Sequence, residues 1–134
     1  MIKIHEYTTY REAEILPLYA AVGWTAYTDA PEALREGFAR SLLVLAAWEE
    51  GRLLGLARAV GDGSTILYLQ DLLVAPAWQH RGIGSRLLRS VLERYPAVRQ
   101  VLLAADDTPA LRAFYQAQGF RELAGLGCCA FMKV

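Results

Sequence analysis

The feature that most limits how this chain can fold is a set of three apolar runs separated by glycine-containing turns. Two runs, residues 42–48 and 53–60, flank the turn Glu49-Glu50-Gly51-Arg52, and a third covers residues 65–74 after Gly61-Asp62-Gly63. Short apolar runs bounded by such turns are typical of neighbouring strands. The sequence therefore predicts a three-stranded meander at the centre of the fold.

A strand and two helices are expected before the meander. Alternating apolar and polar residues at positions 2–5 predict a short strand. The spacing of Thr9 and Glu12 is that of a capping box, which predicts a helix over residues 9–21. An aromatic-containing connection then leads to a second helix, which we expect over residues 29–40.

Helices and strands alternate after the meander. The predicted elements are, in order, a helix over residues 82–95, a strand over 100–105, a helix that Thr108-Pro109 begins and Gly119 ends, and closing strands over 120–123 and 130–133. The strand–helix–strand unit should have a right-handed crossover, so that its two strands are parallel. The expected fold class is α/β, with one mixed, largely antiparallel sheet, helices on both faces and a single domain over residues 1–134.

Composition argues against several classes of protein. The 14 basic and 14 acidic side chains cancel, so the chain has no broad attraction to nucleic acid or anionic lipid, and the longest apolar run is too short to span a bilayer. The adjacent Cys128 and Cys129 fit a reducing compartment and no leader is evident, so we expect a cytoplasmic protein. The spacing of these cysteines, His5 and His80 matches no metal site, so no metal is expected.

One segment between a predicted strand and a predicted helix has a pattern suited to anions. Residues 79–86 read Gln-His-Arg-Gly-Ile-Gly-Ser-Arg, with two glycines one residue apart at the helix start. N–H groups there have no partner within the helix, and the helix dipole adds positive charge, which suits a phosphate or pyrophosphate. Arg81 and Arg86 could add charge-assisted hydrogen bonds. From spacing alone, a tight turn with two solvent-facing arginines fits equally well.

Three clusters of residues together resemble the GNAT superfamily of N-acetyltransferases. They are Val74-Ala75-Pro76, Gln79-x-x-Gly82-x-Gly84, and Ala113-Phe114-Tyr115 with Gly119-Phe120. The second resembles the acyl-CoA-binding motif of the superfamily, Q/R-x-x-G-x-G/A, and the third resembles its final helix, F-Y-x-x-x-G-F. The match covers residues 68–121 closely. The N-terminal half, through Leu18-Tyr19-x-x-Val22-Gly23-Trp24, is similar to small bacterial members.

This resemblance implies acetyl-CoA as acyl donor. Its pantetheine arm would lie in an opening between the strands at 65–74 and 100–105, and its pyrophosphate would rest on the N–H groups of residues 81–86. Many relatives have Asn after the second of these strands; here Asp106 and Asp107 stand there, and Thr108 could replace its contact. The expected cofactor-binding residues are Leu73, Val74, Gln79, His80, Arg81, Gly82, Ile83, Gly84, Ser85, Arg86, Asp106, Thr108, Phe114 and Tyr115.

The implied reaction moves an acetyl group from the thioester to a primary amine by direct attack. Tyr115 matches the tyrosine of the family, which would protonate the CoA sulfur from the start of the final helix; a tyrosine that only packs beside Phe114 is the alternative. Asp71 interrupts an apolar strand and is the candidate general base. A structural Asp that bonds a loop or fixes a bulge fits as well, and so does a water chain directed by Asp71, Gln70 or Tyr68.

The acceptor amine is expected opposite the CoA. Trp24 and Tyr27, with Tyr68 and Gln70, are the candidate substrate residues, although the first two aromatic side chains could equally cover the core. Protein lysine, free amino acids and arylalkylamines all stay open as acceptors, and a homodimer through exposed terminal strands stays open too. The alternative to an enzyme is a CoA-binding sensor or an interaction module without catalysis.

Overall fold

The computed structural model describes residues 1–134, which divide into two compact units. The first unit, Met1–Ala104, contains the sheet and most of the helices; the second, Ala105–Val134, contains one α-helix and an irregular C-terminal segment. The single domain expected from the sequence stays a prediction.

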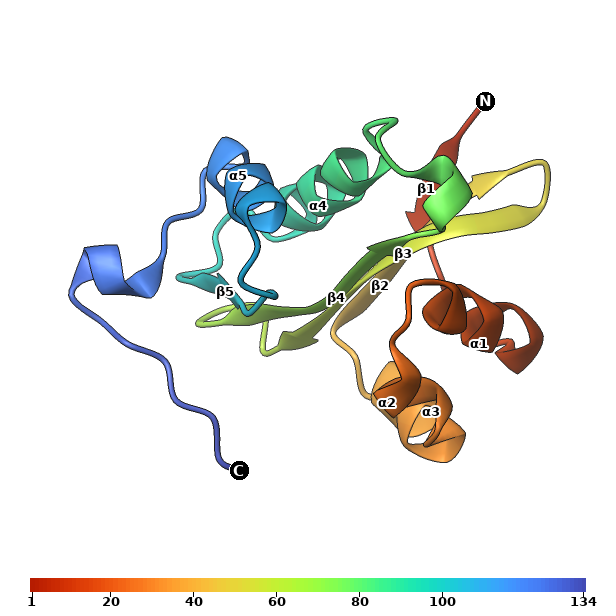
Figure 1. Ribbon diagram of the computed structural model, residues 1–134, viewed down its shortest axis with the longest axis horizontal. Coiled ribbons are helices and arrows are strands. Elements are labelled where there is room, and N and C mark those ends of the chain that lie inside the picture. The colour runs from red at the N-terminus through yellow and green to blue at the C-terminus, as the bar shows by residue number, and fades with distance from the viewer. The chain divides into compact units, whose positions relative to one another are not determined.

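The first unit is built on a five-stranded sheet with the strand order β1-β2-β3-β4-β5 (Figure 1). The strands are β1 (Lys3–Glu6), β2 (Leu43–Glu49), β3 (Arg52–Gly61), β4 (Leu67–Val74) and β5 (Val101–Leu103). Neighbours from β1 to β4 are antiparallel, whereas β5 pairs with β4 in parallel. Positive φ angles of 50° at Glu50 and 76° at Gly51 suit the β2–β3 hairpin turn. The predicted meander and the predicted parallel pair are both confirmed.

Helices cover both faces of this sheet, as predicted (Figure 1). They are α1 (Glu12–Ala21), α2 (Thr25–Thr28), α3 (Pro31–Ala39) and α4 (Ile83–Arg94). The first three lie on one face, where Tyr19 and Phe38 join Leu56 and Leu73 of the strands in a buried cluster. On the other face lies α4, whose predicted apolar stripe is buried at Ile83, Leu87, Leu88 and Val91. Each aliphatic side chain so buried contributes about 1.5–3 kcal/mol.

A β-bulge in β4 decides which way its side chains face. Arg58 pairs with Asp71 and Ala59 pairs with Leu69, so Gln70 is an extra residue on β4. In a regular strand, residues two apart face the same side of the sheet. Because Gln70 is left out of the pairing, Leu69 and Asp71 face opposite sides although they are two residues apart. Asp71 therefore shares the face of Arg58, against α1–α3, whereas Leu69 shares the face of Ala59.

The parallel pair is short. Only Leu67–Leu69 of β4 pair with Val101–Leu103 of β5, and β4 continues to Val74 past the end of its neighbour. Backbone groups at the carboxyl end of β4 therefore have no strand on that side. This agrees with the opening expected between the two strands.

Local predictions failed where a contact from outside the segment decides the structure. The first helix begins at Glu12 and not at Thr9, and its N-cap residue, Arg11, makes no side-chain cap. The Tyr7 hydroxyl takes that place, because it accepts from Arg11 N at 3.1 Å and donates to Glu14 Oε1 at 2.9 Å. The predicted capping box was therefore wrong. The aromatic connection after α1 contains the short helix α2, which was not predicted.

The second unit confirms one prediction and contradicts another. Helix α5 (Pro109–Ala117) follows Thr108, whose Oγ1 accepts from Leu111 N at 3.2 Å, as the predicted cap requires. The closing strands predicted over 120–123 and 130–133 do not form: a 3₁₀ turn, η2 (Leu123–Leu126), and irregular backbone stand there. A strand forms only when another strand accepts its hydrogen bonds, and none pairs with this segment.

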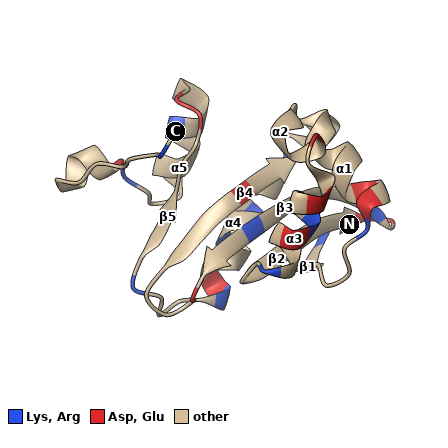
Figure 2. Ribbon diagram, turned by 90° about the horizontal axis from the view of Figure 1, so that it is seen from below, with Lys and Arg blue, Asp and Glu red and all other residues tan.

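Acidic and basic residues are interspersed along the ribbon and are not gathered by sign (Figure 2). The balance found in the composition therefore also holds along the chain. None of the helices combines the length and the apolar character that crossing a bilayer demands.

Candidate functional site

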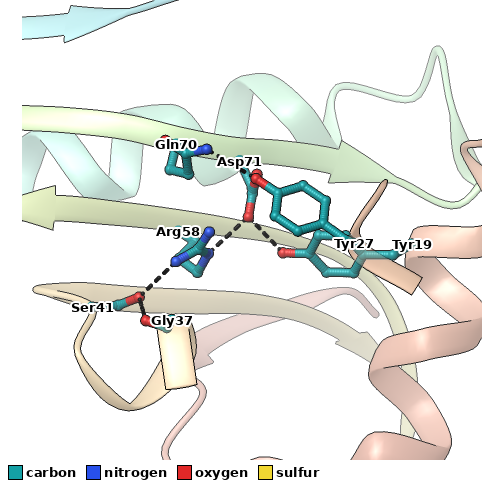
Figure 3. Close-up of polar contacts among 7 residues, drawn as sticks. All are labelled: Tyr19, Tyr27, Gly37, Ser41, Arg58, Gln70 and Asp71. Carbon is teal, nitrogen blue, oxygen red and sulfur yellow. Dashed lines mark hydrogen bonds and ion pairs between the residues drawn. The ribbon is translucent and has the colours of Figure 1, made fainter. Parts of the chain in front are cut away.

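A buried network of polar side chains surrounds Asp71 (Figure 3). Its carboxylate accepts hydrogen bonds from Arg58 Nε at 2.7 Å, from the Tyr19 hydroxyl at 2.8 Å and from the Tyr27 hydroxyl at 2.6 Å. The Arg58 and Asp71 side chains are only 7% and 1% exposed, so their ion pair lies in the protein interior. Because these buried charges are not hydrated, each is stabilised by the opposite charge of its partner.

Further contacts hold Arg58 in place. Its Nη1 donates to Ser41 Oγ at 3.3 Å, and that hydroxyl donates to the Gly37 carbonyl at 2.7 Å. A Cβ on Gly37 would lie 3.1 Å from Arg58 Nη1, so the absence of a side chain at Gly37 lets the guanidinium occupy this position. The guanidinium also lies over the Phe38 ring, 5.5 Å from its centroid. The network thus runs from α3 through β3 to β4.

The network holds one negative and one positive charge. Burial raises the pKa of Tyr19, and the neighbouring Asp71 carboxylate raises it further. The same two causes raise the pKa of Tyr27. Burial alone would lower the pKa of Arg58, but the Asp71 carboxylate outweighs it, so the net change is upward. Both phenols and the guanidinium therefore keep their protons at neutral pH.

These contacts favour the structural role considered for Asp71. A general base needs an oxygen within reach of the substrate proton. Here Oδ1 and Oδ2 both accept from the protein, and the residue is 2% exposed. The bulge at Gln70 is what places Asp71 opposite Arg58. The general-base role stays a prediction.

Three of the four predicted substrate residues lie together. Gln70 Nε2 donates to the Tyr27 hydroxyl at 2.9 Å, and the Trp24 ring lies 6.1 Å from the Tyr27 ring. Tyr68 is half-buried further along β4, where it pairs with Val60, and no hydrogen bond or ring contact joins it to this group. The acceptor role of all four residues stays a prediction.

Three members of the network were not predicted from the sequence: Tyr19, Ser41 and Arg58. A signal for Arg58 exists, because it is the charged residue that interrupts the apolar run at 53–60, as Asp71 interrupts the run at 65–74. Two lone, opposite charges in neighbouring predicted strands indicate a buried ion pair. Tyr19 and Ser41 have no such signal.

The second group of predicted residues lies where β4 ends and α4 begins. A 3₁₀ turn, η1 (Pro76–Trp78), follows the strand, and Gln79 Nε2 donates to the Val74 carbonyl at 3.0 Å. The motif glutamine thereby ties the turn to the strand. His80 and Gly82 have φ angles of 63° and 80°, in the left-handed region. Glycine suits this region because it has no Cβ.

The backbone at the start of α4 has the properties of an anion site. Arg86 N donates to the Gly82 carbonyl at 3.1 Å, which is the first turn of the helix. The N–H groups of Ile83 and Gly84 precede this bond, so they have no partner within the helix. A Cβ on Gly82 would meet no atom within 4 Å, so the space beside it is open. This backbone fits the diphosphate of a nucleotide cofactor.

The two arginines of the motif have contacts within the protein. The Arg81 guanidinium lies over the Trp78 ring, 4.7 Å from its centroid, and Arg86 Nη2 donates to the Ile2 carbonyl at 3.2 Å. Both side chains are exposed. Their contacts with phosphate stay predictions.

The remaining predicted residues belong to the second unit. Tyr115 lies in the last turn of α5 and not at its start, which corrects the expectation, and its ring packs against Phe114 at 5.0 Å and Phe120 at 5.9 Å. Burial raises the pKa of Tyr115. The Thr108 hydroxyl caps α5, and the Thr108 N–H donates to the Asp106 carbonyl at 2.9 Å.

Comparisons with known proteins place the chain in a family. The model of the acetyltransferase (GNAT) domain matches residues 6–129. An N-acetyltransferase of the ycf52-like type from Prochlorococcus marinus is 30% identical over 124 residues, 88% of this chain and 67% of that protein. The peptidyl-lysine N-acetyltransferase YiaC of Escherichia coli is 39% identical over 74 residues, 54% of this chain and 47% of that protein.

Solved structures agree with this placement. A GNAT-family acetyltransferase from Streptococcus pneumoniae has a TM-score of 0.91 and 34% identity, with 100% of this chain and 98% of that chain covered. A GNAT-family acetyltransferase from Elizabethkingia anophelis, solved with acetyl-CoA bound, shares the fold at 18% identity and a TM-score of 0.69, over 90% of this chain and 76% of that one. The resemblance and the fold class predicted from the sequence are thereby confirmed: the chain belongs to the GNAT family of acetyltransferases, which are acyltransferases that use acetyl-CoA.

Proposed function

We propose that this protein is an N-acetyltransferase that moves the acetyl group of acetyl-CoA to a primary amine. The observation that carries the proposal is the backbone at the start of α4, where the N–H groups of Ile83 and Gly84 precede the first helical bond beside an open, left-handed Gly82. There the diphosphate of CoA would bind. The acetyl-CoA held by a protein of the same fold supports the choice of donor.

The pantetheine arm would lie along the carboxyl end of β4. Past Leu69 this strand pairs with no other strand on the β5 side, so its backbone groups there are left for an extended amide chain, which would add as a strand does. Leu73 and Val74 are the residues concerned, although the Val74 carbonyl already accepts from Gln79. This arrangement leads the thioester away from the diphosphate along the strand.

In the reaction the amine nitrogen attacks the thioester carbon. A C–N bond forms and the C–S bond breaks; the nitrogen loses one proton to a base or to solvent, and the CoA thiolate takes one from the Tyr115 phenol, which regains a proton from water. Burial raises the pKa of Tyr115, so the phenol carries the proton that it must donate throughout the neutral range.

For the acceptor, protein lysine is the class to test first, because one relative is named a peptidyl-lysine N-acetyltransferase. Binding of CoA and acetyl-CoA should be measured by calorimetry, and thiol release should be followed with a lysine peptide, free amino acids and arylalkylamines. We expect saturable binding and amine-dependent thiol release. Binding without release would favour a CoA sensor, and absence of binding would favour an interaction module.

The acid role is tested by Tyr115→Phe. Because general acid catalysis contributes about 10²–10⁴-fold, kcat should fall by about that factor while CoA affinity stays unchanged. The raised pKa of Tyr115 also places the alkaline decline of kcat above the ordinary tyrosine value of about 10, and the variant should lack this decline. A kcat within twofold of the wild-type value would remove Tyr115 from the chemistry.

A further inference from the structure

The Tyr27 phenol stands at the border between the buried network and solvent. Asp71 is 2% exposed and Tyr19 is fully buried, whereas Tyr27 is half-buried and its partner Gln70 is exposed. The hydroxyl donates to Asp71 Oδ1 at 2.6 Å and accepts from Gln70 Nε2 at 2.9 Å. Since its single proton is committed to the carboxylate, the oxygen can interact with an incoming group only as an acceptor.

An amine is the group that suits such an oxygen. A short hydrogen bond to a carboxylate polarises the phenol, which strengthens it as an acceptor in a region of low dielectric. Arg58 pairs with the charge of Asp71, so the network offers no free carboxylate to capture an ammonium ion. The acceptor would therefore be selected by a directed hydrogen bond, and the Trp24 ring beside Tyr27 offers an apolar surface to its carbon stem.

We propose that Tyr27 Oη accepts a hydrogen bond from an N–H of the acceptor amine, and that Asp71 and Gln70 are positioning residues that fix this phenol. The inference rests on the proposed function and names a contact within it. When one N–H of a primary amine points at Tyr27, the nitrogen lone pair points elsewhere and is left for the thioester carbon. The contact itself makes and breaks no covalent bond.

Tyr19 provides a control that distinguishes a substrate contact of Tyr27 from a purely structural role of its phenol. Both phenols donate to the same carboxylate, Tyr19 to Oδ2 and Tyr27 to Oδ1, so either Tyr→Phe change removes one donor from Asp71. Only Tyr27 has an exposed hydrogen-bonding partner, and Tyr19 is fully buried. Tyr19→Phe is therefore the matched control for the loss of a donor without the loss of a substrate contact.

The experiment is steady-state kinetics by thiol release for each amine of the panel that the wild-type protein acetylates. In Tyr27→Phe the KM for the amine should rise about 10- to 100-fold, the effect of losing one hydrogen bond to a polarised or charged group. The KM for acetyl-CoA should stay within twofold. Gln70→Leu should raise the amine KM about threefold, and Tyr19→Phe should leave it within twofold while lowering the unfolding midpoint.

Each outcome bears on the proposal separately. An unchanged amine KM in Tyr27→Phe, with the wild-type protein active, overturns the proposal and leaves the proposed function standing. An equal rise in Tyr19→Phe also overturns it, because the effect would then pass through Asp71. Absence of any acetylation by the wild-type protein overturns both. If Tyr27→Phe does not fold by circular dichroism, Gln70→Leu decides, because this exposed side chain is not part of the core; an unchanged amine KM there is contrary to the proposal.

Discussion

Two polar regions of the first unit differ in where their hydrogen bonds go. Around Asp71, donors and acceptors bind one another within the chain, and the ion pair with Arg58 is buried. At the start of α4, the N–H groups of Ile83 and Gly84 have no partner in the helix, and most neighbouring side chains are exposed. A region whose polar groups form hydrogen bonds with one another contributes to the stability of the fold. A region whose N–H groups have no partner in the helix can instead form hydrogen bonds with a ligand. Substitutions in the two regions should therefore affect different measurements.

The largest effect is expected on folding, in the Asp71 network. Removing one partner of a buried ion pair costs about 3–5 kcal/mol of unfolding free energy. In Asp71→Leu the Arg58 guanidinium keeps only Ser41 as a hydrogen-bond partner, whereas in Arg58→Met the carboxylate keeps both phenols. Asp71→Leu should thus lower the unfolding free energy by nearer 5 kcal/mol and Arg58→Met by nearer 3 kcal/mol, both measured by urea unfolding. Costs below about 1 kcal/mol, or the reverse order, would contradict this account of the network.

The next effect is expected on binding, at the start of α4. A side chain at Gly84 would hold a diphosphate away from the N–H groups, so Gly84→Val should weaken CoA binding by at least about 100-fold, about 2.7 kcal/mol. Its unfolding free energy is measured in parallel, because Gly84 is half-buried and a loss of CoA binding must be separated from a loss of stability. Calorimetry and urea unfolding measure the two quantities. Gly125→Val is the control, since Gly125 lies outside the motif and its Cβ would meet no atom within 4 Å. Micromolar CoA affinity in Gly84→Val would rule out the backbone site.

The smallest effect is expected for Arg86. If this exposed guanidinium exchanges the Ile2 carbonyl for a phosphate, Arg86→Ala should lower CoA affinity about three- to tenfold, and less so at high salt. Arg89→Ala is the control, since Arg89 is exposed on the same helix but outside the motif. Equal affinities of the two variants, or a loss that does not depend on salt, would leave phosphate binding to the backbone alone.

What the sequence predicted correctly depends on local chemistry. The meander follows from its glycine turns and short apolar runs, and α5 begins and ends where Thr108, Pro109 and Gly119 predict. The start of α4 was found because two glycines at a helix start have a local meaning whatever surrounds them.

What it missed depends on contacts between distant segments. Arg58 and Asp71 meet through a strand register that includes a bulge, and no local pattern marks that bulge. Tyr7 replaces the predicted cap of α1 from before the helix. The C-terminal strands were predicted from residues that could form a strand, but a strand also needs a neighbour, which the sequence of the segment itself does not specify.

The bulge at Gln70 makes the register of β4 as important as the identity of its residues. If β4 kept Gln70 but ran without the bulge, Gln70 would pair with Arg58 and Asp71 with Ala57. The Asp71 carboxylate would then face the side of the sheet that α4 covers, where aliphatic side chains such as Leu87 and Leu88 are buried. During divergence, the apolar residues of this strand can exchange for one another while the pair survives, and even the loss of the codon for Gln70 would leave Asp71 opposite Arg58.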